Sequence, residues 1–194
     1  MTTAVLVIDV QESFCVRDSW TDVSAPDIAE RVARLVAHAR QAGQEVIWVL
    51  HSEPGTGGAF DPEQGHVRLM AGLVPRGDEM VITKTSHNAF TSTNLGQHLT
   101  SRGVGEVVVA GIRTEQCCET TARLASDLGY RVQFVLDATA TMPLPQWDGS
   151  GTISTADVIS RTASALQGRF AEVVTLADVL ADRVAGARPE RVRR

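Results

Sequence analysis

The stretch from Val107 to Arg123 reads VVVAGIRTEQCCETTAR and combines an apolar run, a glycine and a polar helix start. The β-branched run 107–110 is short, which is typical of a strand buried inside a parallel sheet. Gly111 ends this run, and Thr114 is a good N-cap for a helix expected from Glu115 to about Leu128. The stretch therefore predicts a strand–turn–helix unit of an α/β fold.

Cys117 falls in the first turn of that expected helix, where backbone N–H groups have no partner within the helix. The positive end of the helix dipole favours a thiolate there, and free N–H groups can stabilise an oxyanion on a carbonyl attacked by the sulfur. Cysteines that only pack in a core are common. The position thus predicts a reactive cysteine only if other reactive groups join it.

Composition limits the class of protein. A chain of 194 residues suits one α/β domain with a sizeable core. The formal net charge is −5 without a basic stripe, so we expect no nucleic-acid partner. Neither a transmembrane-length apolar run nor a signal-peptide pattern is present, and we expect no membrane association. Three cysteines, two of them adjacent, form no disulfide framework, which favours a cytoplasmic protein.

Strands and helices alternate along the rest of the chain. Apolar runs predict further strands at 4–8, 45–50, 80–83, 132–136 and 171–175, and helical periods predict helices at 27–41, 95–100 and 155–167. This alternation predicts a single α/β domain over 1–182 with a mostly parallel sheet covered on both faces, followed by a basic tail over 183–194. The irregular, glycine-containing segment 51–75 is long enough to be functional or mobile, so it is a candidate lid.

Three unlike reactive residues each follow a different expected strand: Asp9, Lys84 and Cys117. Right-handed crossovers bring the carboxyl ends of parallel strands to one edge of the sheet, so we expect these side chains to meet. There Lys84 can stabilise a thiolate, while Asp9 can take the thiol proton and return it to a departing amine. These three residues predict nucleophilic attack of the cysteine on a carbonyl, which forms a thioester that water then hydrolyses. A structural Asp–Lys ion pair is the alternative.

Four motifs carry a resemblance to a known family: LVIDVQESF around Asp9, KTSHNAFTSTNL from Lys84, GIRTEQCCETTARLASDLGYRV around Cys117, and DAT at Asp137. They resemble those of the isochorismatase-like cysteine hydrolases, a superfamily that includes isochorismatases, nicotinamidases and N-carbamoylsarcosine amidases. The resemblance implies a three-layer α/β/α, Rossmann-like domain with a six-stranded sheet. It also implies a triad of Asp9, Lys84 and Cys117, no cofactor, and a homo-oligomer, either a dimer or a tetramer.

The resemblance further implies a cis peptide between Ile112 and Arg113, which would turn the N–H groups of Arg113 and Cys117 towards one oxyanion. The sequence departs from the family pattern at Cys118, where valine is usual, and we expect that side chain to pack. Cys15 has no assigned role. The Asp-x-His metal pair of nicotinamidases is missing. His51, Glu53, Asp61 and His66 match no recognised metal spacing, so we expect no metal.

Pocket candidates come from the loops at the same edge: Phe14, Trp20, His51, Phe90 and Arg113. Aromatic walls with a few polar groups suit a small amide or planar acid, and Arg113 can pair with a substrate carboxylate. Instead of binding substrate, each of these side chains could simply pack in the protein interior, and Arg113 could reach solvent.

The leading hypothesis is a metal-independent amidohydrolase that cleaves the C–N bond of a small amide or ureido compound. One alternative is an isochorismatase-type vinyl-ether hydrolase, and another is a non-catalytic small-molecule-binding or partner-binding member of the family. A thiol redox protein is the last, but adjacent cysteines on one helix diverge and close a disulfide poorly.

Overall fold

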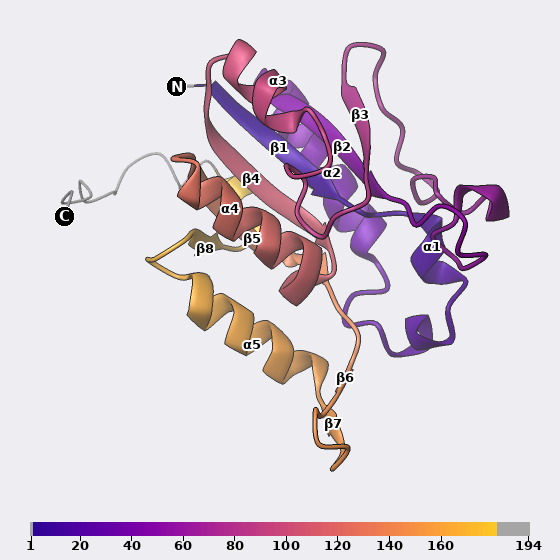
Figure 1. Cartoon of the computed structure of the whole chain (residues 1–194). Helices are drawn as coiled ribbons and strands as arrows, with labels where there is room; N and C mark the ends of the chain where they lie inside the picture. The colour runs from indigo at the N-terminus through magenta and orange to yellow at the C-terminus, as the bar shows by residue number, and fades with distance from the viewer. Residues whose placement is uncertain (1, 182–194) are drawn as a thin grey trace.

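The computed structural model describes residues 2–181, which form a six-stranded parallel sheet between two layers of helices (Figure 1). The strands are β1 (Thr2–Ile8), β2 (Glu45–His51), β3 (Met80–Lys84), β4 (Val104–Ile112), β5 (Arg131–Ala140) and β8 (Glu172–Val174). Their order is β3-β2-β1-β4-β5-β8, and every neighbouring pair is parallel. The predicted α/β/α fold is confirmed.

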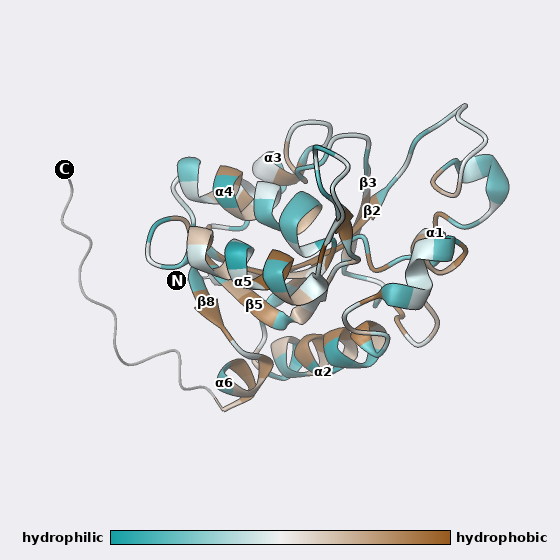
Figure 2. Ribbon diagram, turned by 90° about the horizontal axis from the view of Figure 1, so that it is seen from below, coloured by the Kyte–Doolittle hydropathy of each residue, from teal (hydrophilic) through white to brown (hydrophobic). Residues whose placement is uncertain are grey.

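Helices cover both faces of this sheet (Figure 2). The helices α2 (Ile28–Gln41) and α6 (Leu176–Leu180) lie on one face. The opposite face carries α3 (Leu95–Ser101), α4 (Glu119–Asp127) and α5 (Thr155–Leu166). Among residues 2–181, no helix is both long and apolar enough to cross a membrane. The basic tail predicted over 183–194 lies outside the described residues.

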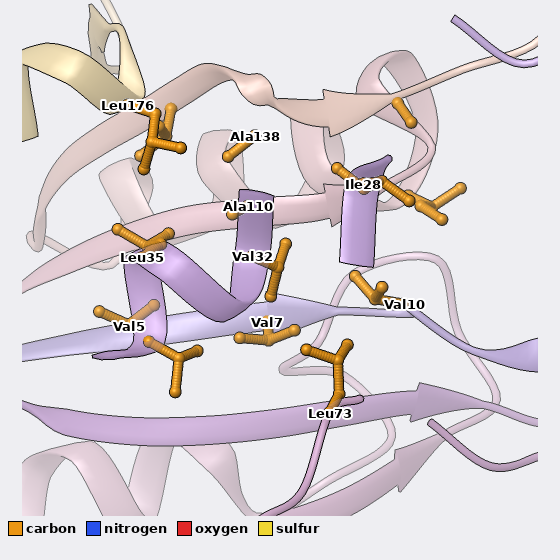
Figure 3. Close-up of a cluster of buried hydrophobic side chains, with 14 of the residues drawn as sticks. Val5, Val7, Val10, Ile28, Val32, Leu35, Leu73, Ala110, Ala138 and Leu176 are labelled. Carbon is orange, nitrogen blue, oxygen red and sulfur yellow. The ribbon is translucent and has the colours of Figure 1, made fainter. Parts of the chain in front are cut away.

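Two apolar clusters hold the layers together. Along β1, Val5 and Val7 enter the cluster under α2, whereas Leu6 and Ile8 enter the cluster on the opposite face, because successive strand side chains alternate between faces. The apolar stripe of α2 meets the first cluster (Figure 3). The central strands are therefore buried on both sides, and their ends are fixed in place.

Several short elements lie outside the predicted pattern. A four-residue helix, α1 (Glu12–Cys15), follows β1, and 3₁₀ turns occupy Asp18–Asp22 and Pro62–Gln64. A two-stranded hairpin of β6 (Leu144–Pro145) and β7 (Thr152–Ile153) projects from the body between β5 and α5 (Figure 1). These elements are too short for a hydrophobic period to reveal them.

The turn after β4 differs from the prediction. Strand β4 continues through Gly111 to Ile112, and Thr114 does not cap a helix. Its hydroxyl instead donates to Thr139 Oγ1 at 2.9 Å, and a π-helical turn, Thr114–Cys118, precedes α4. The predicted cap was wrong because β5, a distant segment, supplies the competing acceptor. Cys117 thus lies in a widened turn between β4 and α4.

A close approach between β1 and β4 sets the two central strand ends level. Ile8 pairs with Gly111, whose φ is +134°, and an added Cβ there would lie 1.9 Å from the Ile8 carbonyl oxygen. Only glycine fits such a contact. The residue that follows β1, Asp9, has a left-handed φ of +52°. The carboxyl ends of these strands therefore bring Asp9 and the Ile112–Thr114 turn to one edge of the sheet.

Candidate active site

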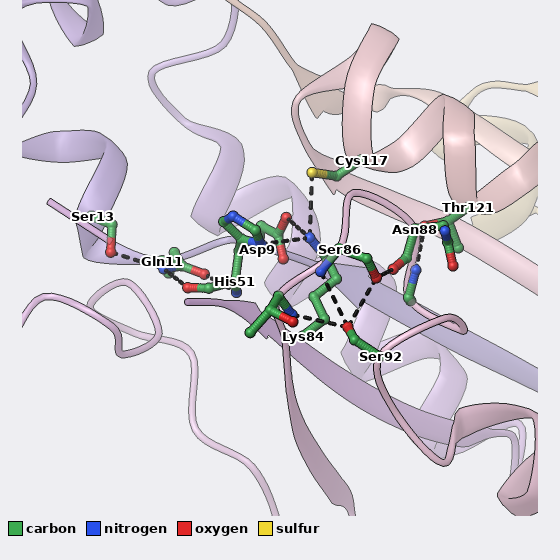
Figure 4. Close-up of polar contacts among 12 residues, drawn as sticks. Asp9, Gln11, Ser13, His51, Lys84, Ser86, Asn88, Ser92, Cys117 and Thr121 are labelled. Atoms are coloured by element: carbon green, nitrogen blue, oxygen red, sulfur yellow. Dashed lines mark hydrogen bonds and ion pairs between the residues drawn. The ribbon is translucent and has the colours of Figure 1, made fainter. Parts of the chain in front are cut away.

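Asp9, Lys84 and Cys117 meet at the carboxyl edge of the sheet (Figure 4). The Lys84 Nζ lies 2.7 Å from Asp9 Oδ2 and donates a hydrogen bond to Cys117 Sγ at 3.3 Å. Both the Asp9 and Lys84 side chains are completely buried, and Cys117 is 7% exposed. An acid, an ammonium and a thiol therefore share one enclosed space, as their positions after three separate strands predicted.

The surroundings of Cys117 favour the protonated thiol. Burial, together with the nearby Asp9 charge, raises the pKa of Cys117 to about 12, although Lys84 opposes this rise. The thiolate expected from the helix terminus and Lys84 stays a prediction, and the loss of hydration and the neighbouring carboxylate act against it. Burial also raises the pKa of Asp9, against the opposing effect of Lys84. The thiol lies beside a carboxyl that is more basic than usual.

His51 makes the third contact of the Lys84 ammonium. It ends β2 next to Lys84 in the sheet register, and its Nδ1 lies 3.3 Å from Lys84 Nζ. The other ring nitrogen, Nε2, lies 3.2 Å from Glu53 Oε1. Burial and the Lys84 charge lower the pKa of His51, which favours a neutral imidazole.

Gln11 anchors this part of the site, and sequence analysis did not identify it. Its side-chain Oε1 accepts from the His51 N–H at 2.7 Å, and its Nε2 donates to the His51 carbonyl at 3.0 Å and to Ser13 Oγ at 2.8 Å. The Ser13 hydroxyl in turn donates to the His66 carbonyl at 3.0 Å. A polar residue that continues an apolar run without a turn signal was the clue available at Gln11.

Two of the predicted pocket residues share an aromatic cluster. The rings of Phe14 and Phe60 meet edge to face with centroids 4.9 Å apart, and those of His51 and Phe60 are 5.5 Å apart. Phe60 lies in the irregular segment 51–75, where the sequence carries no period, so the sequence analysis missed it. This cluster forms an apolar wall beside His51 and hence beside Lys84.

The other pocket candidates are engaged elsewhere. Phe90 stacks on Tyr130 at 6.1 Å, and Tyr130 precedes β5 at the opposite end of the sheet from Cys117. Trp20 packs against the core cluster under α2. The Arg113 guanidinium pairs with Glu115 at 3.1 Å and donates to the Met142 carbonyl at 3.0 Å. Partners from its own loop and the next one occupy this cation, which leaves it poorly placed for a substrate carboxylate.

The peptide bond between Ile112 and Arg113 is cis. It lies directly before the turn that carries Cys117, where the Arg113 carbonyl accepts hydrogen bonds from the N–H groups of Gln116 and Cys118. The oxyanion-binding role of the Arg113 and Cys117 N–H groups stays a prediction.

The remaining cysteines differ from Cys117 in their surroundings. Cys118 is completely buried within the apolar cluster on the face of the sheet opposite α2, and burial raises its pKa well above the usual range. Cys15 is exposed, and neither it nor the other two cysteines forms a disulfide. The packing role expected of Cys118 agrees with this burial.

The four residues considered as metal ligands are spread over several contacts. Asp61 accepts hydrogen bonds from the backbone N–H groups of Gly57 and Glu63, whereas His51 and Glu53 bond to each other. Over residues 2–181, no group of three or more His, Cys, Asp or Glu side chains is arranged to hold a metal ion.

Comparisons with known proteins agree with this architecture. The isochorismatase domain model matches residues 3–178. The isochorismatase family protein YddQ of Bacillus subtilis (strain 168) is 34% identical over 90% of this chain and 97% of its own length. A streptothricin hydrolase of Streptomyces noursei is 35% identical, and the aligned region covers 88% of this chain and 61% of that enzyme. The crystal structure of a cysteine hydrolase from Pseudomonas syringae pv. phaseolicola 1448A superposes with a TM-score of 0.84 at 30% identity, covering 92% of this chain and 91% of the other. The chain belongs to the isochorismatase family of hydrolases.

Proposed function

We propose that this protein is a cysteine-dependent amidohydrolase that cleaves the C–N bond of a small amide or ureido compound. The observation that carries the proposal is the contact between Lys84 Nζ, Cys117 Sγ at 3.3 Å and Asp9 Oδ2 at 2.7 Å in a buried site. The similarity to a streptothricin hydrolase and to a cysteine hydrolase supports it.

In the first half-reaction, Asp9 takes the thiol proton of Cys117 as the sulfur attacks the substrate carbonyl carbon. A neutral thiol with a raised pKa requires such a base, and the raised pKa of Asp9 makes its carboxylate a better acceptor. The tetrahedral oxyanion then collapses, the C–N bond breaks, and the departing nitrogen takes the proton from Asp9. A thioester on Cys117 remains.

In the second half-reaction, a water molecule attacks the thioester carbonyl while Asp9 accepts a water proton. The C–S bond breaks, the acid product leaves, and the proton returns to Cys117. Lys84 stays an ammonium throughout and offsets the negative charge that moves between Asp9 and the sulfur. Its hydrogen bond to Cys117 and its ion pair with Asp9 orient these partners without entering the proton balance.

The test is amine or ammonia release from a panel of small amides and ureido acids without added metal. We expect release by the wild type and by Cys118→Ala, which removes the neighbouring buried sulfur, and none by Cys117→Ala. Mass spectrometry of an enzyme sample quenched during turnover should show an acyl adduct on the Cys117 peptide. Full activity in Cys117→Ala would contradict the proposal. Release from no panel member would favour vinyl-ether cleavage or a binding protein.

A further inference from the structure

We infer that His51 is a positioning residue for Lys84. Its neutral ring carries its proton on Nε2, where Glu53 holds it, and accepts a hydrogen bond from the Lys84 ammonium through Nδ1. The kinetic consequence rests on the proposed function of Asp9, Lys84 and Cys117, whereas the tautomer and the hydrogen bond do not.

The ammonium group fixes the direction of the first hydrogen bond. Lys84 has three N–H donors and no acceptor, so the His51 Nδ1 at 3.3 Å must offer its lone pair. The same ammonium donates a hydrogen bond to Cys117 Sγ at 3.3 Å and forms an ion pair with Asp9 Oδ2 at 2.7 Å. An imidazole nitrogen, a sulfur and a carboxylate therefore surround this fully buried ammonium.

Glu53 selects the same tautomer from the other side of the ring. A carboxylate only accepts hydrogen bonds, so the Glu53 oxygen, 3.2 Å from Nε2, requires the ring proton on that nitrogen. The two contacts are independent, because Lys84 ends β3 and Glu53 follows β2. With both nitrogens engaged, His51 has no ring nitrogen left for a substrate or a metal, which argues against its predicted substrate-binding role.

The surroundings hold this ring in one orientation. Gln11 bonds to both the N–H and the carbonyl of His51, and Phe60 packs edge-on against the imidazole. The His51 side chain is 13% exposed, so few rotamers are open to it. A fixed acceptor of this kind can hold the end of a long, flexible lysine in place.

Protonation of His51 would remove the acceptor and place a second cation 3.3 Å from Lys84 Nζ. The charged and titratable groups that face the ring are Lys84, Asp9, Glu53 and the His87 ring, whose centroid is 6.5 Å away. Burial and the Lys84 charge lower the pKa of His51, and this keeps the ring neutral at neutral pH. The positioning contact is therefore present under the conditions in which the site would work.

Two measurements test the inference without any substrate. Nitrogen-15 NMR of the imidazole rings, with His51→Asn used for assignment, should show His51 neutral and protonated on Nε2 at pH 7. Iodoacetamide labelling of Cys117, followed on its peptide, should shift to higher pH in His51→Leu. The reason is that an ammonium no longer held in place beside the sulfur stabilises the thiolate less. A doubly protonated ring, or a proton on Nδ1, would overturn the inference.

Kinetics with a substrate from the panel provide the third measurement. We expect kcat to fall on the order of 10²-fold in His51→Leu, with little change in KM, because misplacing Lys84 affects the transition state more than binding. His51→Asn puts an amide oxygen at the Nδ1 position and should recover most of kcat. The matched control is His98→Leu, since His98 also pairs with a carboxylate, Glu45, but at the opposite edge of the sheet.

Equal kcat values for His51→Leu and His98→Leu would overturn the positioning role. A fall in His51→Leu that His51→Asn does not relieve would also contradict it, because only a structural defect would then explain the loss. If no compound is turned over at all, the amidohydrolase proposal fails by itself. The tautomer and the labelling shift still decide the inference in that case.

Discussion

Replacing Gly111 by alanine adds one methyl group between the two central strands. Gly111 pairs with Ile8, and the new Cβ would lie 1.9 Å from the Ile8 carbonyl oxygen and 2.8 Å from its nitrogen. The first of these distances is about 1.5 Å shorter than an ordinary van der Waals contact of 3.4 Å. Neither backbone can move easily, because Ile8 is paired with both β2 and β4.

Two costs add in this variant. Holding alanine at a φ of +134° costs about 1–3 kcal/mol. The overlap with Ile8 adds an overpacking cost of about 1–3 kcal/mol or more. We therefore expect the free energy of unfolding to fall by about 2–6 kcal/mol or more, a large part of a typical total of about 5–15 kcal/mol.

Gly103→Ala provides the matched control. Gly103 also has a positive φ, +63°, but a Cβ added there would meet no atom within 4 Å, so the backbone cost of about 1–2 kcal/mol stands alone. Urea unfolding followed by far-UV circular dichroism measures both variants at one pH and temperature. Equal losses in the two variants would refute the argument from close strand approach. Folded Gly111→Ala should also be inactive, because Asp9 follows Ile8 directly.

The remaining predictions concern Asp9 as the proton acceptor and the ion pair between Glu79 and Arg40. Asp9→Asn cannot accept the thiol proton, so we expect kcat on a panel substrate to fall about 10²–10⁴-fold. The control is Asp148→Asn, at an exposed position, which should leave kcat unchanged. Retained activity in Asp9→Asn would exclude Asp9 as the base. Burial raises the pKa of Glu79, but hydrogen bonds from Arg40 and Trp48 outweigh burial and lower this pKa from 4.5 to about 2. The ionised Glu79 therefore stabilises the fold fully above pH 4.5, and this contribution is lost as the pH falls towards about 2. Allowing for solvent screening, Glu79→Gln should lose about 1–2 kcal/mol in urea unfolding at pH 7 and progressively less below pH 4.5; a pH-independent loss would contradict the ionic origin.

The order of strands and helices could be predicted from the sequence because it depends on local periodicity. The continuous apolar run of β1 and the apolar stripe of α2 are written in neighbouring residues, and the parallel arrangement then follows from right-handed crossovers. The convergence of Asp9, Lys84 and Cys117 follows from the same rule, since each comes at or after a strand end. Short elements such as the β6–β7 hairpin carry too few residues for a period.

The details of the site depend on contacts between distant segments. Thr114 finds its partner in Thr139, Arg113 is bound by Glu115 and the Met142 carbonyl, and Phe60 comes from a loop without a period. No local propensity encodes such pairings, because they form only when the strands have been placed side by side.

The sequence by itself determined which reactive groups this protein brings to one sheet edge and in what order along the chain. Only the tertiary structure decided how the pKa values of Asp9 and Cys117 shift and which third side chain contacts Lys84. The pKa of the Cys117 thiol is raised because the fold removes it from water and places Asp9 beside it. His51 meets Lys84 because β2 and β3 are paired in one register. Both effects come from burial and long-range packing, which a pattern of neighbouring residues does not contain.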